Sequence, residues 1–333
     1  MGNKRNALID MTRVAAAVGI VLCHVDLTGY GLPGTLLGQF LGARFSLMFF
    51  LAVIGFYVEK SDQAGEKTIL KRVSNLLRIY GLWSCVYLAF SFVMLVLIQK
   101  MPLGQFLISR VKGFLFTGSY YHFWFYPAVI YTLLIIGVVK KVLGPRARVV
   151  LMPLAVALYV VGLLGTGYLP LGQQIPGLLA LYELENFEAL MHLFLLGFPA
   201  VIFGMAAANQ NRRCPGLVVL IAAALYVAES MVLCFVLGWY ENPQIMMTTP
   251  LLTVSFLRWA QNSKLSDKKI NHSLCRVVSG GMYHVHPLIL AAFAVIMPGM
   301  DGLLTFTLCV LSSAIFGWML YSLRKRKFFA LYI

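Results

Sequence analysis

Residues 7–25 read ALIDMTRVAAAVGIVLCHV, an apolar stretch long enough to cross a lipid bilayer as one helix. It carries three ionisable side chains, Asp10, Arg13 and His24. Such groups are costly to bury in lipid, so an ionisable residue inside a membrane helix is expected to have a function or a partner. The stretch therefore predicts a membrane helix that also carries chemistry.

The spacing of Arg13 and His24 places both on one face of this helix. Eleven residues at about 100° each come to roughly 20° beyond three turns and span about 16 Å. Asp10 lies three residues before Arg13, close enough for an ion pair that orients the guanidinium. This face predicts a channel wall that leads from a cytoplasmic charge to an outer histidine. In the alternative interpretation, Arg13 snorkels to the interface, Asp10 pairs with it, and His24 lies among outer head groups.

The composition extends the membrane interpretation to the whole chain. Of 333 residues, 60% are hydrophobic and 12% are charged, whereas soluble domains average about 25% charged residues. There is too little polar surface for a water-facing globule, which excludes a soluble nucleic-acid-binding protein. The six cysteines form no CxxC pair, so neither a disulfide framework nor a metal site is predicted.

The basic residues give the predicted orientation of the helices. With the N-terminus inside, 23 of the 27 basic residues fall on the cytoplasmic side, and only Arg44, Lys100, Arg110 and Lys112 remain outside. The formal charge of +15 therefore reports topology rather than a polyanionic partner. We expect an all-α integral membrane bundle of about ten transmembrane helices with both termini cytoplasmic, near residues 7–25, 44–58, 79–98, 122–139, 148–164, 192–208, 216–237, 244–260, 282–297 and 302–321.

One membrane domain is expected over residues 1–333, with no separate soluble domain. The longest outer loops are predicted at 99–121 and 165–191. The second loop carries Glu183, Glu185 and Glu188, which are interpreted either as a solvated acidic loop or as a rim that faces an acceptor.

The pattern Asp10-x-x-Arg13 followed by His24 resembles the N-terminal signature of the acyltransferase family 3 membrane proteins, whose bacterial members O-acylate cell-surface glycans. Four later segments resemble the family in order, although Ile54 stands where the family commonly has Ser and Gly81 replaces its usual Pro. These segments are RFSLMFFLAVIGFYV (44–58), LKRVSNLLRIYGLW (70–83), YHFWFYPAVIY (121–131) and MYHVHPLIL (282–290).

The resemblance implies an integral O-acyltransferase in the cell membrane that uses cytoplasmic acyl-CoA as co-substrate and has no permanently bound cofactor. The nucleotide end of acyl-CoA needs basic groups, for which the cytoplasmic candidates are Arg13, Arg72, Arg78 and Lys71. His24 is the expected general base on the acceptor hydroxyl, and an acyl-histidine intermediate is the alternative.

The acceptor-side candidates are His122, Trp124, Arg44, His286 and Tyr283. An interfacial aromatic belt explains Trp124 and is the favoured interpretation, and the alternative is that His122 helps to position the acceptor. His284 is expected to fill or border the bundle, and it cannot form a metal pair with His286 because residues two apart point about 200° apart on a helix. Glu229, an acid inside a predicted span, is expected to have a buried partner, with Arg44 or His192 at a suitable depth.

Two functional classes compete. The first is transfer of an acyl group, most simply acetyl, to a hydroxyl of an extracytoplasmic or lipid-linked glycan. The second is a ten-span secondary transporter of a small metabolite, a class often built from internal repeats with broken helices. No such repeat is visible here, and the pair Arg13 and His24 lies in one predicted helix, so the enzyme is favoured. A membrane sensor or scaffold has no support in the sequence.

Overall fold

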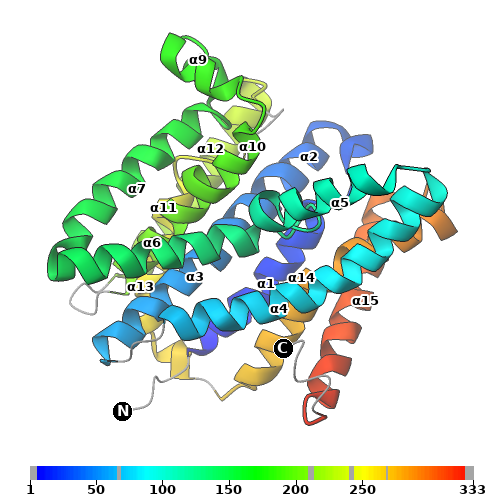
Figure 1. The fold of residues 1–333 in the computed structure, drawn as a ribbon. Helices are drawn as coiled ribbons and strands as arrows, with labels where there is room; N and C mark the ends of the chain where they lie inside the picture. Colours follow the sequence, from blue (N-terminus) through cyan, green and yellow to red (C-terminus); the bar gives the residue numbers. More distant parts are fainter. Residues whose placement is uncertain (1–5, 66–68, 209–213, 240–243, 268, 327–333) are drawn as a thin grey trace.

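The computed structural model describes residues 6–65, 69–208, 214–239, 244–267 and 269–326 (Figure 1). Within these ranges the chain forms helices and turns and no strand, which confirms the predicted all-α class. Some basic residues that contribute to the predicted orientation lie outside the described residues: Lys4, Arg5, Lys67, Arg212, Arg213, Lys268 and Lys327.

The α-helices follow one another along the chain, and short helices alternate with long ones. Their bounds are α1 (Ala7–Leu22), α2 (Gly31–Thr35), α3 (Ala43–Gln63), α4 (Ile69–Ser91), α5 (Leu103–Lys112), α6 (Phe125–Leu143), α7 (Ala147–Leu164), α8 (Leu169–Gly172), α9 (Pro176–Tyr182), α10 (Phe187–Leu190), α11 (Phe198–Ala207), α12 (Gly216–Met231), α13 (Thr249–Asn262), α14 (His272–Ile296) and α15 (Gly302–Leu323).

Several rods are extended by wider, π-helical turns, and three short 3₁₀ turns connect others. The π-helical segments are η2 (Leu36–Gly42), η3 (Phe92–Ile98), η4 (Gly113–Thr117), η6 (Met191–Gly197) and η7 (Val232–Val236). The 3₁₀ turns are η1 (Thr28–Tyr30), η5 (Gly144–Arg146) and η8 (Lys264–Asp267).

Among the described residues, seven helical stretches are long and apolar enough to cross a membrane. One of them, Phe125–Leu164, contains both α6 and α7, which the sequence predicts as two spans. Helices α1 and α13 have 16 and 14 residues and fall short of the roughly 17 to 25 residues of a typical span. The count of ten spans and the side of each terminus therefore stay predictions.

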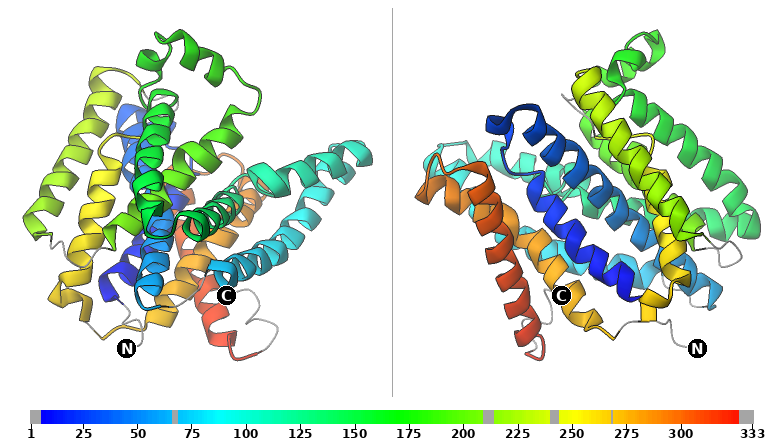
Figure 2. Two further views of the ribbon diagram at one scale, coloured as in Figure 1. Left: turned by 60° about the vertical axis from the view of Figure 1, so that its left-hand side comes forward. Right: turned by 180° about the vertical axis from the view of Figure 1, so that it is seen from behind.

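Helix α1 lies at the centre of the bundle, where it packs against α3 and α14. Its start and the end of α15 point toward the same end of the molecule (Figure 2). Helix α3 in turn packs against α11, and α14 against α15. The α3–α11 crossing is close because two glycines meet the facing backbone: a Cβ on Gly55 would stand 1.9 Å from the Val201 carbonyl oxygen, and one on Gly204 would stand 1.8 Å from that of Ala52.

The two long predicted loops contain helices, which corrects the prediction. Residues 99–121 include α5 and η4, and together with α4 and η3 they form a hairpin that extends sideways from the other helices (Figure 2). Residues 165–191 include all of α8, α9 and α10. Short segments of this kind lack the long apolar run by which a membrane helix is recognised in sequence.

Helix α1 also ends earlier than predicted. Asn6 caps its start by accepting the Ile9 amide at 3.1 Å, and Leu22 is its last residue. His24 lies in the turn that follows, where its backbone N–H donates to Val21 at 3.1 Å. The prediction of one continuous helix from Arg13 to His24 is therefore wrong for the residues after Leu22.

Candidate active site

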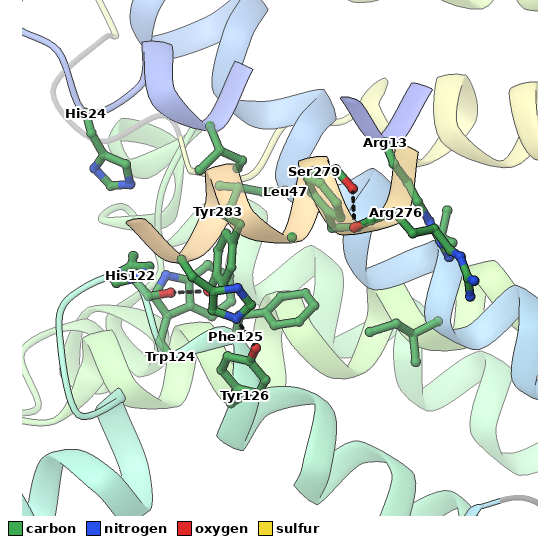
Figure 3. A pocket seen from close by; sticks show the side chains of 16 residues that line it. Arg13, His24, Leu47, His122, Trp124, Phe125, Tyr126, Arg276, Ser279 and Tyr283 are labelled. Carbon is green, nitrogen blue, oxygen red and sulfur yellow. Dashed lines mark hydrogen bonds between the residues drawn. The ribbon is translucent and has the colours of Figure 1, made fainter. Parts of the chain in front are cut away.

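Arg13 and His24 nevertheless line one cavity, which we call the central cavity. It has a volume of about 230 Å³ and is bounded by side chains from α1, α3, α6 and α14, from the turn after α1 and from the turn before α6. His24 lies at one end, and Arg13 and Arg276 lie at the other (Figure 3). Between them the wall includes Leu47, Trp124, Phe125, Tyr126, Ser279 and Tyr283.

Asp10 fixes the position of Arg13. One Asp10 carboxylate oxygen accepts from Arg13 Nη1 at 3.2 Å, and the other lies 2.8 Å from His272 Nδ1. Only 2% of the Asp10 side chain is exposed, so an ion pair and a second hydrogen bond offset the cost of burying it. The Arg13 guanidinium also lies 5.5 Å from the centre of the Tyr57 ring.

A second cavity, the arginine cavity, adjoins the Arg13 end. It has a volume of about 260 Å³, and its lining includes Arg13, Arg72 and Arg276. The two cavities share Arg13, Val53, Ile54 and Arg276. Arg72 is held in place there because its Nη2 donates to the Tyr57 carbonyl at 3.1 Å and to Ser61 Oγ at 2.9 Å. Three guanidinium groups thus surround one end of a passage that leads to His24.

Two of the predicted donor-binding residues do not reach this passage. Lys71 and Arg78 are exposed and line neither the arginine cavity nor the central cavity. The reason is helical geometry, since positions 71 and 78 are rotated by about 100° and 240° from position 72 on α4. Their assignment to the donor site is therefore corrected, while Arg13 and Arg72 lie where such a role requires them.

Arg276 lines both cavities, whereas the sequence analysis assigns it only a topological role. A signal for it exists in the sequence. Arg276 precedes Tyr283 by seven residues, which is close to two full helical turns, so both side chains lie on one face of α14. Tyr283 and Arg276 do line the same cavity.

The His24 ring packs against two other aromatic rings. Its centroid lies 5.1 Å from that of His286, with an interplanar angle of 23°, and 5.0 Å from that of Tyr121. His286 is fully buried, and its Nδ1 lies 3.0 Å from the Met282 carbonyl oxygen. A carbonyl accepts only, so this contact places the His286 proton on Nδ1. His286 thus packs beside His24 in a fixed ring orientation.

His122 is the second histidine in the wall of the central cavity. Only 3% of it is exposed, and neither ring nitrogen has a hydrogen-bond partner among the described residues. Its ring lies 5.4 Å from that of His286, and its backbone carbonyl accepts from the Tyr283 hydroxyl at 2.6 Å. A neutral imidazole offers one donor and one acceptor, so His122 brings unused hydrogen-bonding capacity to the cavity.

Trp124 is buried rather than interfacial. It is 7% exposed, and its ring stacks on His192 with centroids 4.2 Å apart and an interplanar angle of 7°. The aromatic-belt interpretation of Trp124 and His122 is therefore wrong. Hydropathy does not reveal the burial of Trp124, because a tryptophan at the end of an apolar run gives the same pattern whether it is buried or lies at the membrane interface.

His284 is buried in the bundle, as expected, and it also borders the central cavity. Its Nε2 lies 2.5 Å from the Tyr126 hydroxyl, and its ring stacks on Trp83 at 4.8 Å. Through these two contacts, His284 on α14 packs against α4 and α6. His284 therefore stabilises the wall of the central cavity.

Arg44 lies apart from the central cavity. It is buried, with Nε donating to the Gln39 carbonyl at 2.6 Å and Nη2 to Gln39 Oε1 at 2.9 Å. Arg44 therefore lines neither the central cavity nor the cavity that contains His192, but its charge lies near enough to act on His24 and His192.

Glu229 has partners other than the two predicted. Its carboxylate accepts from the Met247 amide at 2.7 Å, the Thr248 amide at 2.8 Å and the Tyr168 hydroxyl at 2.8 Å. The Thr248 hydroxyl donates to it as well. The pairing with Arg44 or His192 is thus wrong, and Glu229 instead caps the N-terminal end of α13.

Asp26 lies two residues beyond His24 and hydrogen-bonds to Thr28. It is exposed and accepts from the Thr28 amide at 2.8 Å and the Thr28 hydroxyl at 2.6 Å. These hydrogen bonds hold the pKa of the Asp26 carboxyl below its usual value. Asp26 stabilises the turn that follows α1.

A third cavity lies on the other side of Tyr121, and we call it the tyrosine cavity. It has a volume of about 620 Å³ between the α4–α5 hairpin and α10–η6, and Tyr120, Tyr121, Arg110, Glu188 and His192 line it. Tyr121 therefore borders this cavity and also contacts the His24 ring. Of the acidic residues Glu183, Glu185 and Glu188 in the 165–191 segment, all of which are exposed, only Glu188 lines this cavity.

Comparison with known proteins now identifies the family of the chain. The sequence matches the acyltransferase domain of acyltransferase family 3 over residues 6–323, nearly its whole length. The chain belongs to acyltransferase family 3. The family match spans all the helices that line the central cavity. The resemblance noted in the N-terminal and later segments is thereby confirmed.

One curated relative is a serine/alanine racemase from Enterococcus gallinarum, which is 28% identical over 184 residues. That match covers 52% of this chain and 24% of the relative. The chain thus matches about a quarter of the length of this curated protein. No solved structure gives a significant match.

Proposed function

We propose that the protein is a membrane acyltransferase that moves an acyl group, most simply acetyl, from cytoplasmic acyl-CoA to a hydroxyl of an extracytoplasmic or lipid-linked glycan. The family match supports acyl transfer. The observation that carries the proposal is the central cavity, in which a guanidinium pair and a histidine lie at opposite ends (Figure 3). A long, thin donor with an anionic end and a reactive end fits this arrangement.

The donor binds from the arginine cavity. Arg13, Arg72 and Arg276 supply guanidinium groups there, and guanidinium binds phosphate oxygens through paired hydrogen bonds. The arm that carries the thioester then extends along the central cavity past apolar side chains such as Leu47 and Ile54. The thioester thereby reaches His24.

His24 acts as the general base. A neutral imidazole accepts the proton of the acceptor hydroxyl while the hydroxyl oxygen forms a bond to the thioester carbonyl carbon. Collapse of the tetrahedral intermediate breaks the carbon–sulfur bond, and the departing thiolate takes the proton from the imidazolium. The reaction also balances in two steps, in which His24 first takes the acyl group from the thioester and the acceptor hydroxyl then takes it from His24.

His122 and His286 assist His24 in this mechanism. His122 offers a buried N–H with no protein partner among the described residues, which suits the negative charge that develops on the carbonyl oxygen. His286 is a positioning residue, because it packs on the His24 ring at 5.1 Å and is itself fixed by Met282.

The acceptor enters through the tyrosine cavity. Tyr120 and Tyr121 present aromatic rings, and Arg110 and Glu188 present charges, which together suit the faces and hydroxyls of a sugar. Phe90, Met94 and Leu95 add an apolar wall to the same cavity, which a lipid-linked acceptor would contact. We assign this side to the outside of the cell membrane, in agreement with the partition of basic residues.

The experiment that tests this function compares surface glycans from cells with and without the protein by mass spectrometry. We expect acyl-sized mass increments that depend on the protein. Purified protein in nanodiscs with labelled acetyl-CoA and the glycan so identified should then release free CoA thiol. An unchanged glycan profile would contradict the proposal. The transporter alternative is not favoured, because the chain belongs to an acyltransferase family.

A further inference from the structure

A fourth cavity lies beside the arginine cavity, and we call it the lysine cavity. It has a volume of about 310 Å³ between the end of α3, the end of α13 and η8. Two lysines line it, Lys60 from α3 and Lys264 from η8, as do Asn262, Ser263 and Ser266. Asp267 lines it too, so the charged side chains of the cavity sum to a positive value. Its polar lining contrasts with the aromatic and aliphatic wall of the central cavity.

Tyr57 connects this cavity to the donor passage. It lines both the lysine cavity and the arginine cavity, and the Arg13 guanidinium lies 5.5 Å from its ring centre. Lys60 follows Tyr57 by three residues on α3, and its Nζ lies 5.3 Å from the Phe56 ring centre. The order of the cavities is therefore lysine cavity, arginine cavity, central cavity and His24.

We propose that the lysine cavity binds the 3′-phosphorylated nucleoside end of the acyl donor, with Lys60 and Lys264 on the 3′-phosphate. This inference rests on the proposed function, in which the donor is an acyl-CoA. The donor carries two anionic groups in sequence, a phosphate monoester on the ribose and then a diphosphate that leads to the thioester arm. The cavities present two basic clusters in the same sequence, the lysines first and the arginines next.

The chemistry of each cluster fits the group assigned to it. Lysine is a compact point charge that suits a terminal phosphate monoester, whereas arginine forms paired hydrogen bonds along a diphosphate. The amide of Asn262 and the hydroxyls of Ser263 and Ser266 provide donors and acceptors for a ribose and a base. A donor held at both clusters presents its thioester arm to the central cavity.

The test uses full-length protein in nanodiscs of zwitterionic lipid and two probes, CoA and 3′-dephospho-CoA, whose affinities are measured by titration calorimetry. We expect wild-type protein to bind CoA more tightly than 3′-dephospho-CoA. The double variant Lys60→Ala, Lys264→Ala should bind CoA about tenfold more weakly and 3′-dephospho-CoA equally well. The second result also verifies that the variant is folded. Lys269→Ala is the matched control, because Lys269 is exposed and lies outside the lysine cavity.

The outcomes separate this inference from the proposed function. If wild-type protein binds neither probe, the acyl-CoA donor itself is refuted. If it binds both probes equally, or if the double variant keeps the preference for CoA, the lysine cavity is not the 3′-phosphate site, although the donor assignment stands. A phosphate monoester also occurs on lipid head groups. If the double variant keeps the CoA preference but loses stabilisation by added phosphatidic acid, the lysines bind a lipid phosphate and the inference is overturned.

Discussion

Asp10 holds Arg13 without using up its hydrogen-bonding capacity. The guanidinium has five N–H donors, of which one hydrogen bond goes to Asp10 at 3.2 Å. The other Asp10 oxygen contacts His272, so the carboxylate is fixed from two sides. Arg13 is therefore oriented toward the passage with donors left for a ligand phosphate.

Replacing Arg13 tests this assignment. Arg13→Ala should weaken acyl-CoA binding by about tenfold or more, because it removes a hydrogen bond to a charged group and leaves Asp10 without its cation. Arg13→Lys should restore only part of the affinity, since an ammonium lacks the planar fork. The measurement is titration of purified protein with acetyl-CoA. Unchanged affinity in a folded Arg13→Ala protein would refute the role.

Arg276 and Arg78 form a matched pair for a second prediction. Arg276 lines both the central and the arginine cavity, whereas Arg78 is exposed and lines neither. Arg276→Ala should therefore raise the KM for acetyl-CoA severalfold, and Arg78→Ala should leave it within about twofold. Steady-state kinetics on both variants decides the question. Equal effects would mean that net charge rather than placement determines donor binding.

Some residues of the candidate site are predictable from the sequence and others are not. Arg13, Arg72, His24 and His122 are charged or polar groups at apolar borders, and all are brought to the passage. Arg276 was missed because a juxtamembrane arginine is equally expected for topology alone. The burial of Trp124 depends on its contact with His192, which comes from a distant segment, and no local pattern encodes that contact.

At the scale of elements, glycines set the distance between α3 and α11. A Cβ on Gly204 would lie 1.8 Å from the Ala52 carbonyl oxygen, so alanine there forces the helices apart. Gly204→Ala should destabilise the protein by about 1–3 kcal/mol, the usual cost of overpacking. Gly81→Ala is the control, because nothing lies within 4 Å of a Cβ at that helical position. Thermal unfolding in detergent measures both, and a neutral Gly204→Ala would contradict the close crossing.

The long helices were predictable from sequence because each is an apolar run with polar ends. The end of α1 was not predictable, because Cys23 and Val25 continue the apolar pattern although the helix ends at Leu22. Helix α5 was missed for the opposite reason: Leu103–Lys112 mixes polar and apolar residues, as an exposed loop does. Its helical state depends on pairing with the α4–η3 rod (Figure 2).

At the scale of the whole molecule, the cavities form a path with basic groups at one end and tyrosines at the other. The proposed function requires the basic end to face the cytoplasm. Single cysteines at positions 185 and 266, in a variant that lacks the six native cysteines, test this orientation. A membrane-impermeant thiol reagent added outside should label position 185 and spare position 266. The reverse pattern would refute the orientation and the proposed route of the donor.

The most direct test of the account is the separation of donor binding from transfer at His24. His24 lies at the far end of the central cavity from Arg13 (Figure 3), so its replacement should leave the phosphate-binding groups intact. His24→Gln keeps a polar side chain but cannot accept a proton in the reaction. We expect normal acetyl-CoA affinity by titration and a rate of acyl transfer lowered by roughly 10² or more, the scale of lost acid–base assistance. Near-normal transfer by folded His24→Gln protein would contradict the account.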